Sequence, residues 1–327
     1  MTDMPQRRVG ASGLLVSAIG LGCNNFGRAG THSETLEGTR DVLDAALDAG
    51  VTFLDTADVY GKEPGLSETL MGAALQGRRD RFVVATKFGH SQIPGGVSST
   101  ASKGSRAYVR AAVEASLRRL RTDWIDLYQL HTPDPETPIE ETLDALTELV
   151  REGKVRYIGH SNLSGWQLAQ ADAVARARGA ERFISAQNQY SLLARAAERE
   201  VIPAARASGV GFLPFFPLHN GLLTGKFARE GGPEDSRIMR QRPHVWRDAP
   251  WDALEAYARF CDERGITMLQ ATFGWLLAQP ALASVIAGAT TPDQIRQNAA
   301  AASWTPTADD LDAIDGILPL PADPAAG

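Results

Sequence analysis

Short apolar runs recur along the chain at a regular step, and this repeat restricts the possible folds more than any other feature of the sequence. Most of the runs are apolar without alternation, as strands of a parallel sheet covered by helices are. From residue 52 to residue 211 their starts lie 27 to 43 residues apart, which is the size of one strand–helix–strand step. The eight runs are VSAIGL (16–21), TFLDTA (52–57), FVVATK (82–87), IDLYQL (125–130), VRYIGH (155–160), ISAQNQ (184–189), GFLPFF (211–216) and SVIAGA (284–289).

Helical patterns fill the intervals between these runs. The clearest follows Thr137, because Pro138 suits the first helical position and Glu140 completes a T-x-x-E capping box. Residues 34–49 show a second apolar face, and Gly50 is the expected stop. Eight strands separated by helices predict a (β/α)8 TIM barrel, with a doubly wound open sheet as the competing arrangement.

The two ends of the chain add to this barrel. The segment RRVGASGLLVSAIGLG at the start predicts a short β-hairpin before the first strand. The long interval after 211–216 has room for a loop over 219–250 and for extra helices near 251–264 and 266–278. After about residue 320 the chain is rich in Pro, Ala, Asp and Gly, and we expect its last residues to be loose. Because no linker divides the chain, we expect residues 1–327 to form one domain.

Composition excludes several classes of protein. The 327 residues are 43% hydrophobic and 22% charged, as in an ordinary globular protein. A net charge of −6 argues against a general nucleic-acid binder. No apolar stretch is long enough to cross a bilayer, and the first residues lack the apolar core of a secretion signal. Cys23 and Cys261 are far apart and the histidines show no ligand spacing, so we expect a reducing, cytoplasmic setting and no metal site.

Polar residues follow the predicted strands and would meet at one mouth of the barrel, where the strands end. Asp55 and Tyr60 follow one strand, Lys87 ends the next, and His131 follows the fourth. A tyrosine, with an ordinary pKa of about 10, is a poor acid at neutral pH. A neighbouring ammonium lowers that pKa by stabilising the phenolate, and a carboxylate holds the ammonium in place. This set therefore predicts a site that donates a proton to an oxygen atom.

These residues lie in motifs that resemble the aldo-keto reductases, from the hairpin at Arg8 to about residue 302. The matching blocks are FLDTADVYG, VVATKFG, DLYQLHTPDPETPIEETLDALTELVREGKVRYIGHSN, AQNQYSLL, PLHNGLLTGK and GATTPDQIRQNAAA, and their style is closest to bacterial members and to potassium-channel β subunits. The resemblance implies a catalytic tetrad of Asp55, Tyr60, Lys87 and His131, with Tyr60 as the general acid. It also implies a nicotinamide cofactor, usually NADPH, across the barrel mouth.

The resemblance places the cofactor on residues from four later segments. It implies that Ser161, Asn162 and Gln187 hold the nicotinamide carboxamide and that the ring of Phe215 stacks on the nicotinamide. It further implies contacts to the phosphates from Pro217, Leu218, Asn220, Lys226 and Arg237, and to the adenosine end from Gly288, Thr290, Gln294, Gln297 and Asn298.

The choice between NADP(H) and NAD(H) depends on two opposing features. Several members of the family carry a charged residue where Gly288, Gln294 and Gln297 stand, which weakens the case for NADP(H). Residues 226–247, however, are rich in Lys and Arg although the chain is acidic overall, which indicates a polyanion nearby. We therefore expect NADP(H), with NAD(H) as the alternative.

The expected reaction is reduction of an aldehyde or ketone, a small-molecule partner whose identity the sequence leaves open, as it leaves the oligomeric state and the direction of the reaction. Asn24, Phe26, His219 and Trp246 are candidate substrate contacts. Two alternatives stay open: a class I aldolase with Lys87 as Schiff-base lysine, and an NADP(H)-binding regulatory subunit with little turnover. We interpret Asp58 as a turn residue or cap and His160 as a packed core residue. The glycines of GLGCNNFG lack Rossmann spacing.

Overall fold

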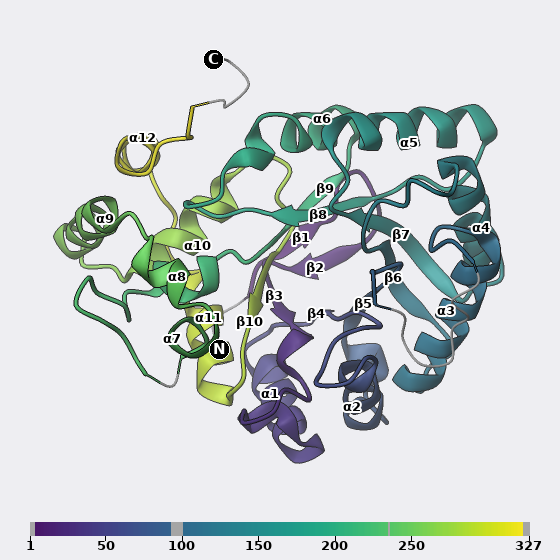
Figure 1. The fold of residues 1–327 in the computed structure, drawn as a ribbon, viewed down its shortest axis with the longest axis horizontal. Helices are drawn as coiled ribbons and strands as arrows, with labels where there is room; N and C mark the ends of the chain where they lie inside the picture. The colour runs from purple at the N-terminus through teal and green to yellow at the C-terminus, as the bar shows by residue number, and fades with distance from the viewer. Residues whose placement is uncertain (1–3, 93–100, 235, 323–327) are drawn as a thin grey trace.

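The computed structural model describes residues 4–92, 101–234 and 236–322, and eight of its strands form one parallel sheet that curls into a ring (Figure 1). The order around the ring is β10-β3-β4-β5-β6-β7-β8-β9. These strands are β3 (Ile19–Gly22), β4 (Phe53–Asp55), β5 (Val83–Phe88), β6 (Ile125–Leu130), β7 (Val155–Ser161), β8 (Ser185–Gln189), β9 (Gly211–Phe215) and β10 (Val285–Gly288). Each overlaps one of the eight predicted runs.

The ring closes between β9 and the residues just before β10. The Phe212 amide donates to the Ala281 carbonyl at 2.7 Å, and the Ala283 amide donates to the Phe212 carbonyl at 2.8 Å. Phe212 also forms a parallel bridge with Leu282. The predicted barrel is therefore confirmed, and the open-sheet alternative is wrong because its two edge strands would not meet.

A helix follows each barrel strand and covers the outside of the ring (Figure 1). In chain order these are α1 (Leu36–Asp48), α2 (Leu66–Ala74), α3 (Arg106–Leu120), α4 (Ile139–Arg151), α5 (Gly165–Arg178), α6 (Val201–Ser208), α10 (Met268–Ala278) and α11 (Pro292–Ala301). The additional helices are α7 (Arg237–Gln241), α8 (Pro243–Arg247), α9 (Trp251–Glu263) and α12 (Ala308–Ile317). Of these, α9 and α12 pack together beyond α10 (Figure 1). The helices expected near 251–264 and 266–278 are α9 and α10, whereas α12 was not predicted.

The N-terminal hairpin closes the end of the barrel away from the tetrad. It consists of β1 (Gln6–Arg8) and β2 (Leu15–Ser17), paired antiparallel as predicted. Val9, Leu14 and Val16 of this segment form a buried cluster with inward-facing barrel residues such as Phe53 and Leu127. A larger apolar core lies between the strands and the surrounding helices. The barrel interior is therefore packed, and access to its polar groups is from the other end.

Two local predictions are corrected by the structure. The capping box at Thr137 is wrong, because the Thr137 hydroxyl donates to an Asp134 carboxylate oxygen at 2.7 Å and α4 begins at Ile139 without a side-chain cap. The interval 219–250 is also more ordered than a loop, since it contains η5 (His219–Thr224), α7 and α8. The expected loose C-terminal end lies largely outside the described residues. Among the described helices, none combines the length and the apolar character needed to span a bilayer.

Candidate active site

A buried ion pair lies at the centre of the open end of the barrel. Lys87 in β5 donates from Nζ to Asp55 Oδ2 at 2.6 Å and to the Thr56 carbonyl at 2.8 Å. The Lys87 side chain is fully buried and that of Asp55 almost so. Burial opposes the ammonium charge, but the charges of Asp55 and Tyr60 outweigh it, and the pKa of Lys87 lies above its ordinary value. The lysine is therefore a fixed cation in a low-dielectric setting.

Tyr60 lies over this cation on the short segment that follows β4. Its ring centre is 5.1 Å from Lys87 Nζ, and its backbone is held by the Ser67 amide, which donates to the Tyr60 carbonyl at 3.0 Å. Burial raises the pKa of Tyr60, and Lys87 offsets only part of that increase. The sequence led us to expect a lowered pKa, so the net direction is opposite, and Tyr60 keeps its proton throughout the neutral range.

His131 completes the group from the end of β6. Its ring packs edge-on against that of Tyr60 with centroids 5.8 Å apart, and its amide donates to the Phe88 carbonyl at 2.7 Å. Burial, together with the positive charge of Lys87, lowers the pKa of His131 to about 2. Its Nδ1 is buried and has no hydrogen-bond partner among the described residues. The structure thus brings all four predicted tetrad residues together, with His131 as a neutral ring.

Two amide side chains hold the second oxygen of Asp55. Gln187 in β8 donates from Nε2 to Asp55 Oδ1 at 2.9 Å, and Gln129 in β6 donates to the same oxygen at 3.3 Å. The sequence analysis assigned Gln187 to the nicotinamide, whereas its amide nitrogen contacts Asp55 in the structure. Gln129 was missed, although it lies in β6 two positions before His131 and its side chain points into the barrel.

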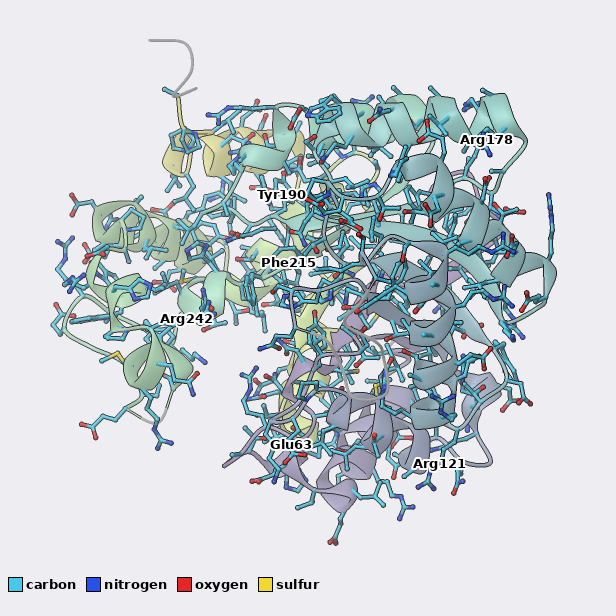
Figure 2. The ribbon with its side chains drawn as sticks, turned by 45° about the vertical axis from the view of Figure 1, so that its right-hand side comes forward. Glu63, Arg121, Arg178, Tyr190, Phe215 and Arg242 are labelled. Carbon is cyan, nitrogen blue, oxygen red and sulfur yellow. The ribbon has the colours of Figure 1, made fainter. Side chains whose placement is uncertain are left out.

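The end of β7 contributes a polar edge beside the tetrad. The Ser161 hydroxyl donates to the Gln187 carbonyl at 2.8 Å, and Asn162 donates from Nδ2 to the His131 carbonyl at 2.9 Å. Asn162 is exposed and has φ of 62°, a left-handed conformation that asparagine tolerates better than most residues. Phe215 lies at the end of β9, partly exposed near the middle of the molecule (Figure 2). These residues form one rim of the barrel mouth.

The segment after β9 approaches the mouth from the side of α7 and α8. Pro217 is buried, whereas Leu218 and Asn220 are partly exposed. The Asn220 carboxamide oxygen accepts a hydrogen bond from Arg242 Nη1 at 3.1 Å, and the Arg242 guanidinium lies 5.7 Å from the Phe216 ring centre. In Figure 2, Arg242 lies on the part of the molecule that carries these two helices. Arg242 is therefore held against the segment that follows β9.

Two arginines from distant segments of the chain, Arg28 and Arg242, lie near each other at the barrel mouth. Arg28 donates to the Asn24 carbonyl at 3.5 Å, and both burial and the positive charge of Arg242 lower the pKa of Arg28. Within the described ranges, neither guanidinium forms an ion pair with a carboxylate. Two like charges in a half-buried position are unfavourable without an anion between them, so the pair indicates a place for a polyanion.

The other basic residues of 226–247 differ in their surroundings. Arg229 pairs with Asp252 and Glu255, and Arg247 pairs with Asp248, so both belong to the solvated surface. Lys226 is exposed beside the ring of Phe227. Arg237 is the first residue of α7, and its side chain lies outside what the structure describes. The basic segment is therefore only partly directed at the mouth, through Arg242.

The predicted adenosine end forms a small exposed platform at β10 and the start of α11. The Gln294 carboxamide oxygen accepts from the Thr290 amide at 2.7 Å and from its hydroxyl at 3.0 Å. Asn298 donates to the Gly288 carbonyl at 3.4 Å. Gly288 and Gln297 are exposed, and a Cβ added at Gly288 would lie 3.0 Å from Asn25 Nδ2. The five predicted residues are thus neighbours, next to the segment that carries Arg28.

The four candidate substrate residues are not brought together. Phe26 is fully buried in the main core, so the expectation that it lines the pocket is corrected: its ring fills apolar space under the first barrel loop. Trp246 donates to the Ala228 carbonyl at 2.9 Å and packs on Trp251, away from the tetrad. Asn24 lies beside Gly288, with its Oδ1 3.9 Å from a Cβ added there. His219 stays a candidate, with a buried Nδ1 that has no partner in the described part of the chain.

Two residues that we interpreted as structural are indeed buried. His160 lies inside β7 and packs on the ring of Phe183, with centroids 5.3 Å apart. Asp58 is fully buried rather than at an exposed turn, and burial, with the nearby charge of Glu68, raises its pKa well above the ordinary value.

His90 was missed as a site residue. It follows the strand that carries Lys87, and its ring centre is 4.9 Å from that of His131. Its place three residues after Lys87, at the end of a barrel strand, is the signal that could have found it.

Comparison with known proteins agrees with this geometry. The model of the Aldo/keto reductase family matches residues 18–319. The chain belongs to this family. It is 37% identical to the uncharacterized oxidoreductase YrpG of Bacillus subtilis (strain 168) over 319 residues, which cover 96% of this chain and 95% of that protein. It is 34% identical to the L-glyceraldehyde 3-phosphate reductase of Escherichia coli (strain K12) over 309 residues, or 90% of this chain and 87% of that protein.

Membership settles the general class of reaction. Aldo/keto reductases are oxidoreductases that act on carbonyl compounds and generally use nicotinamide cofactors, so this chain is an enzyme of that kind. The named relatives are oxidoreductases, neither aldolases nor regulatory subunits. The aldolase alternative also conflicts with the site, because a Schiff base requires a neutral lysine and Lys87 is paired with Asp55 at a raised pKa.

Proposed function

We propose that this aldo/keto reductase reduces an aldehyde or ketone to the alcohol with NADP(H), and that Tyr60 supplies the proton. The observation that supports this most strongly is the buried Lys87–Asp55 pair directly beneath the Tyr60 ring. A bound nicotinamide would supply the hydride for the carbonyl carbon. The side chains of this protein bind the carbonyl oxygen of the substrate and donate a proton to it.

Tyr60 acts as the general acid in this proposal. Its O–H bond breaks, and the proton forms the new O–H bond of the alcohol as the carbonyl double bond is lost. The phenolate that remains is stabilised by the Lys87 ammonium, which is held by Asp55 and cannot move into solvent. Solvent then returns a proton to Tyr60. General acid catalysis of this kind contributes roughly 10²- to 10⁴-fold to a rate.

His131 positions the carbonyl oxygen. Since its pKa is about 2, the ring is uncharged at any physiological pH, and it interacts with the oxygen as a neutral hydrogen-bonding group. Its ring lies edge-on to Tyr60, so an oxygen between the two rings would be within reach of both. A neutral histidine also leaves Tyr60 as the only proton donor of the pair.

The residues of the mouth fit a phosphate-bearing cofactor. Arg28 and Arg242 form no ion pair with a described carboxylate, and Arg242 is bonded to Asn220, one of the residues expected along the pyrophosphate. Asn162 and Phe215 present an exposed amide and a ring for the nicotinamide end. We infer NADP(H) rather than NAD(H) because two like-charged arginines without a carboxylate partner favour the ligand with the greater negative charge. The two buried free cysteines suit a reducing, cytoplasmic setting.

Replacing Tyr60 by Phe tests the assignment. We expect Tyr60→Phe to lower the turnover of aldehydes by about 10²-fold or more, while NADPH still quenches tryptophan fluorescence with an affinity within about twofold of the original. Tyr157→Phe is the matched control, because that phenol lies beside the hairpin at the closed end of the barrel. Full turnover by Tyr60→Phe would remove Tyr60 from the mechanism.

Parallel titration with NADPH and NADH tests the cofactor. We expect NADPH to bind with a lower Kd than NADH. Arg28→Gln should bring the two Kd values closer together. The aldehyde panel should include phosphorylated compounds, because one relative is named for L-glyceraldehyde 3-phosphate. Preferential binding of NADH would show that the arginines serve another anion.

A further inference from the structure

His90 and Lys103 lie near each other beside His131 of the tetrad. His90 packs against His131, with ring centroids 4.9 Å apart and planes at 51°. Lys103 is close enough to lower the pKa of His90 by its charge, after burial itself, and its Cβ would lie 3.6 Å from a Cβ added at Gly89. Both side chains are partly exposed.

The hydrogen bonds of His90 fix which ring nitrogen carries its proton. The Gln92 amide donates to His90 Nδ1 at 3.2 Å, and a backbone amide can only donate. Nδ1 is therefore an acceptor, and the proton of the neutral ring is on Nε2. The Ser91 hydroxyl lies 3.4 Å from the same Nδ1. No described residue accepts a hydrogen bond from Nε2, so this donor is available to a ligand.

The carboxylate nearest to Lys103 is already engaged. Asp134 Oδ2 accepts from the Gly104 amide at 2.6 Å and from the Thr137 hydroxyl at 2.7 Å, and its Oδ1 accepts from the Glu136 amide at 3.1 Å. Lys103 influences Asp134 through space, but the two form no ion pair. Among the described residues, therefore, the Lys103 ammonium has no carboxylate in contact.

A third, independent observation directs these groups toward a ligand. His131 Nδ1 is buried and has no partner among the residues described, and the ring that carries it lies between those of Tyr60 and His90. A compound whose carbonyl oxygen lies at Tyr60 would thus extend past His131 toward His90 and Lys103. Because the carbonyl oxygen would lie between the Tyr60 and His131 rings, one further ring contact, of 4.9 Å between His131 and His90, separates it from His90, and a chain of a few carbon atoms spans that distance.

We propose that His90 Nε2 and Lys103 form a subsite for an anionic group of the substrate, a phosphate or carboxylate a few atoms from the reacting carbonyl. This rests on the proposed reductase function and deepens it by naming the substrate class. His90 donates a hydrogen bond to an anionic oxygen, and Lys103 neutralises the remaining charge. The two residues determine specificity and take no part in the proton transfer itself.

The test compares two aldehydes that differ only in the anionic group, glyceraldehyde 3-phosphate and glyceraldehyde. The unaltered protein should show a kcat/KM about tenfold or more higher for the phosphorylated compound, mainly through KM, because charge-assisted hydrogen bonds are worth that much or more. His90→Ala and Lys103→Gln should each remove most of this preference, because they lower kcat/KM for glyceraldehyde 3-phosphate by a larger factor than kcat/KM for glyceraldehyde.

Two further variants separate binding from general effects on charge and packing. His90→Gln retains an N–H donor and should restore part of the preference that His90→Ala loses. Lys154→Gln removes the same charge at the closed end of the barrel, where Lys154 pairs with Glu114 and Glu152, and should change nothing.

Three results would overturn the proposal. Equal kcat/KM values for the two aldehydes in the unaltered protein would exclude an anion subsite while leaving the reductase function intact. Equal losses for both aldehydes in His90→Ala and Lys103→Gln would assign these residues to structure. Turnover of neither these nor any other aldehyde would remove the reductase function, and the subsite with it.

Discussion

At the scale of single residues, the site depends on charges that burial makes permanent. Tyr60 and Lys87 are so close that each changes the pKa of the other, and the charge of Asp55 acts on both. Reduction requires the protonated form of Tyr60. Because burial places the pKa of Tyr60 above its ordinary value, the rate of reduction should be nearly independent of pH across the neutral range and decrease only in strong alkali.

Lys87→Met should move this alkaline decrease to still higher pH. Lys87 is the group that lowers the pKa of Tyr60, so its removal leaves burial and Asp55, both of which raise it. The rate itself should decrease by about 10²-fold or more, because the phenolate loses its counter-ion. The pH profile of kcat/KM measures both effects.

A decrease at lower pH in Lys87→Met would contradict this account. Since Asp55 is left as an unpaired buried charge in that variant, the double change Asp55→Asn with Lys87→Met is the stability control. The double variant should also move the alkaline decrease to higher pH, because Lys87 changes the pKa of Tyr60 more than Asp55 does.

His160 should make the protein sensitive to acid. Burial lowers its pKa to about 3, whereas an exposed histidine in the unfolded chain titrates near 6.5. Between these values the unfolded state binds the additional proton, so stability decreases as pH falls from about 6.5 toward 3, by about 3 kcal/mol at pH 4. His160→Phe, which keeps a ring against Phe183, should remove most of this difference.

Urea unfolding at pH 7 and pH 4 gives the free energies for that comparison. The background slope from His131, whose pKa is about 2, should persist in both proteins. If the free energy of unfolding of His160→Phe decreased between pH 7 and pH 4 as much as that of the unaltered protein, His160 would be protonated in the folded state at pH 4.

At the scale of elements, patterning predicts the barrel strands well and the polar contacts poorly. Apolar runs and their spacing identify the strands, because each must be buried on both sides. The capping box at Thr137 failed because α4 begins one residue later than expected, with Pro138 as its N-cap, so Thr137 lies outside the capping position. The contact of Gln187 with Asp55 joins residues 132 positions apart, and no local pattern carries that information. Arg28 was missed for the same reason, whereas His90 was missed although its place at the end of the strand that carries Lys87 is a local signal.

The hairpin depends on one close backbone approach. Gly10 has φ of 56°, and an added Cβ would lie 2.3 Å from the Gly209 carbonyl oxygen and 2.6 Å from the Gly211 amide nitrogen. Gly153 has φ of 75° but no atom within 4 Å of such a Cβ. Gly153→Ala should therefore cost only the left-handed backbone penalty of about 1–2 kcal/mol. Gly10→Ala should cost about 1–3 kcal/mol more, since the hairpin must move off β9.

Urea unfolding of both variants at neutral pH separates the two effects. If Gly10→Ala and Gly153→Ala lost the same free energy of unfolding, the left-handed backbone conformation alone would explain the glycine at position 10. Turnover should be unaffected in Gly153→Ala, because that residue follows α4 at the closed end of the barrel.

At the scale of the whole molecule, the protein is acidic overall but carries a cluster of positively charged side chains at the barrel mouth. The net charge is −6, yet Lys87, Arg28, Arg242 and Lys103 surround the barrel mouth. Folding places these cations together although they come from distant segments, and the arrangement is unfavourable until an anion binds. Ligands that bring negative charge should therefore stabilise the fold by more than their contacts to uncharged groups suggest.

NADP⁺ should accordingly raise the melting temperature, and Arg28 should be responsible for much of the increase. A ligand at 100 times its Kd adds about 2.7 kcal/mol, which corresponds to about 4 °C for a chain of this size. Arg28→Gln removes one of two mutually repelling charges, so the ligand-free variant should melt at the same temperature or slightly higher. Its increase with NADP⁺ at the same concentration should be clearly smaller. Arg229→Gln, which removes a surface arginine paired with Asp252, should keep the full increase, and an equal increase in all three proteins would show that Arg28 does not contact the cofactor.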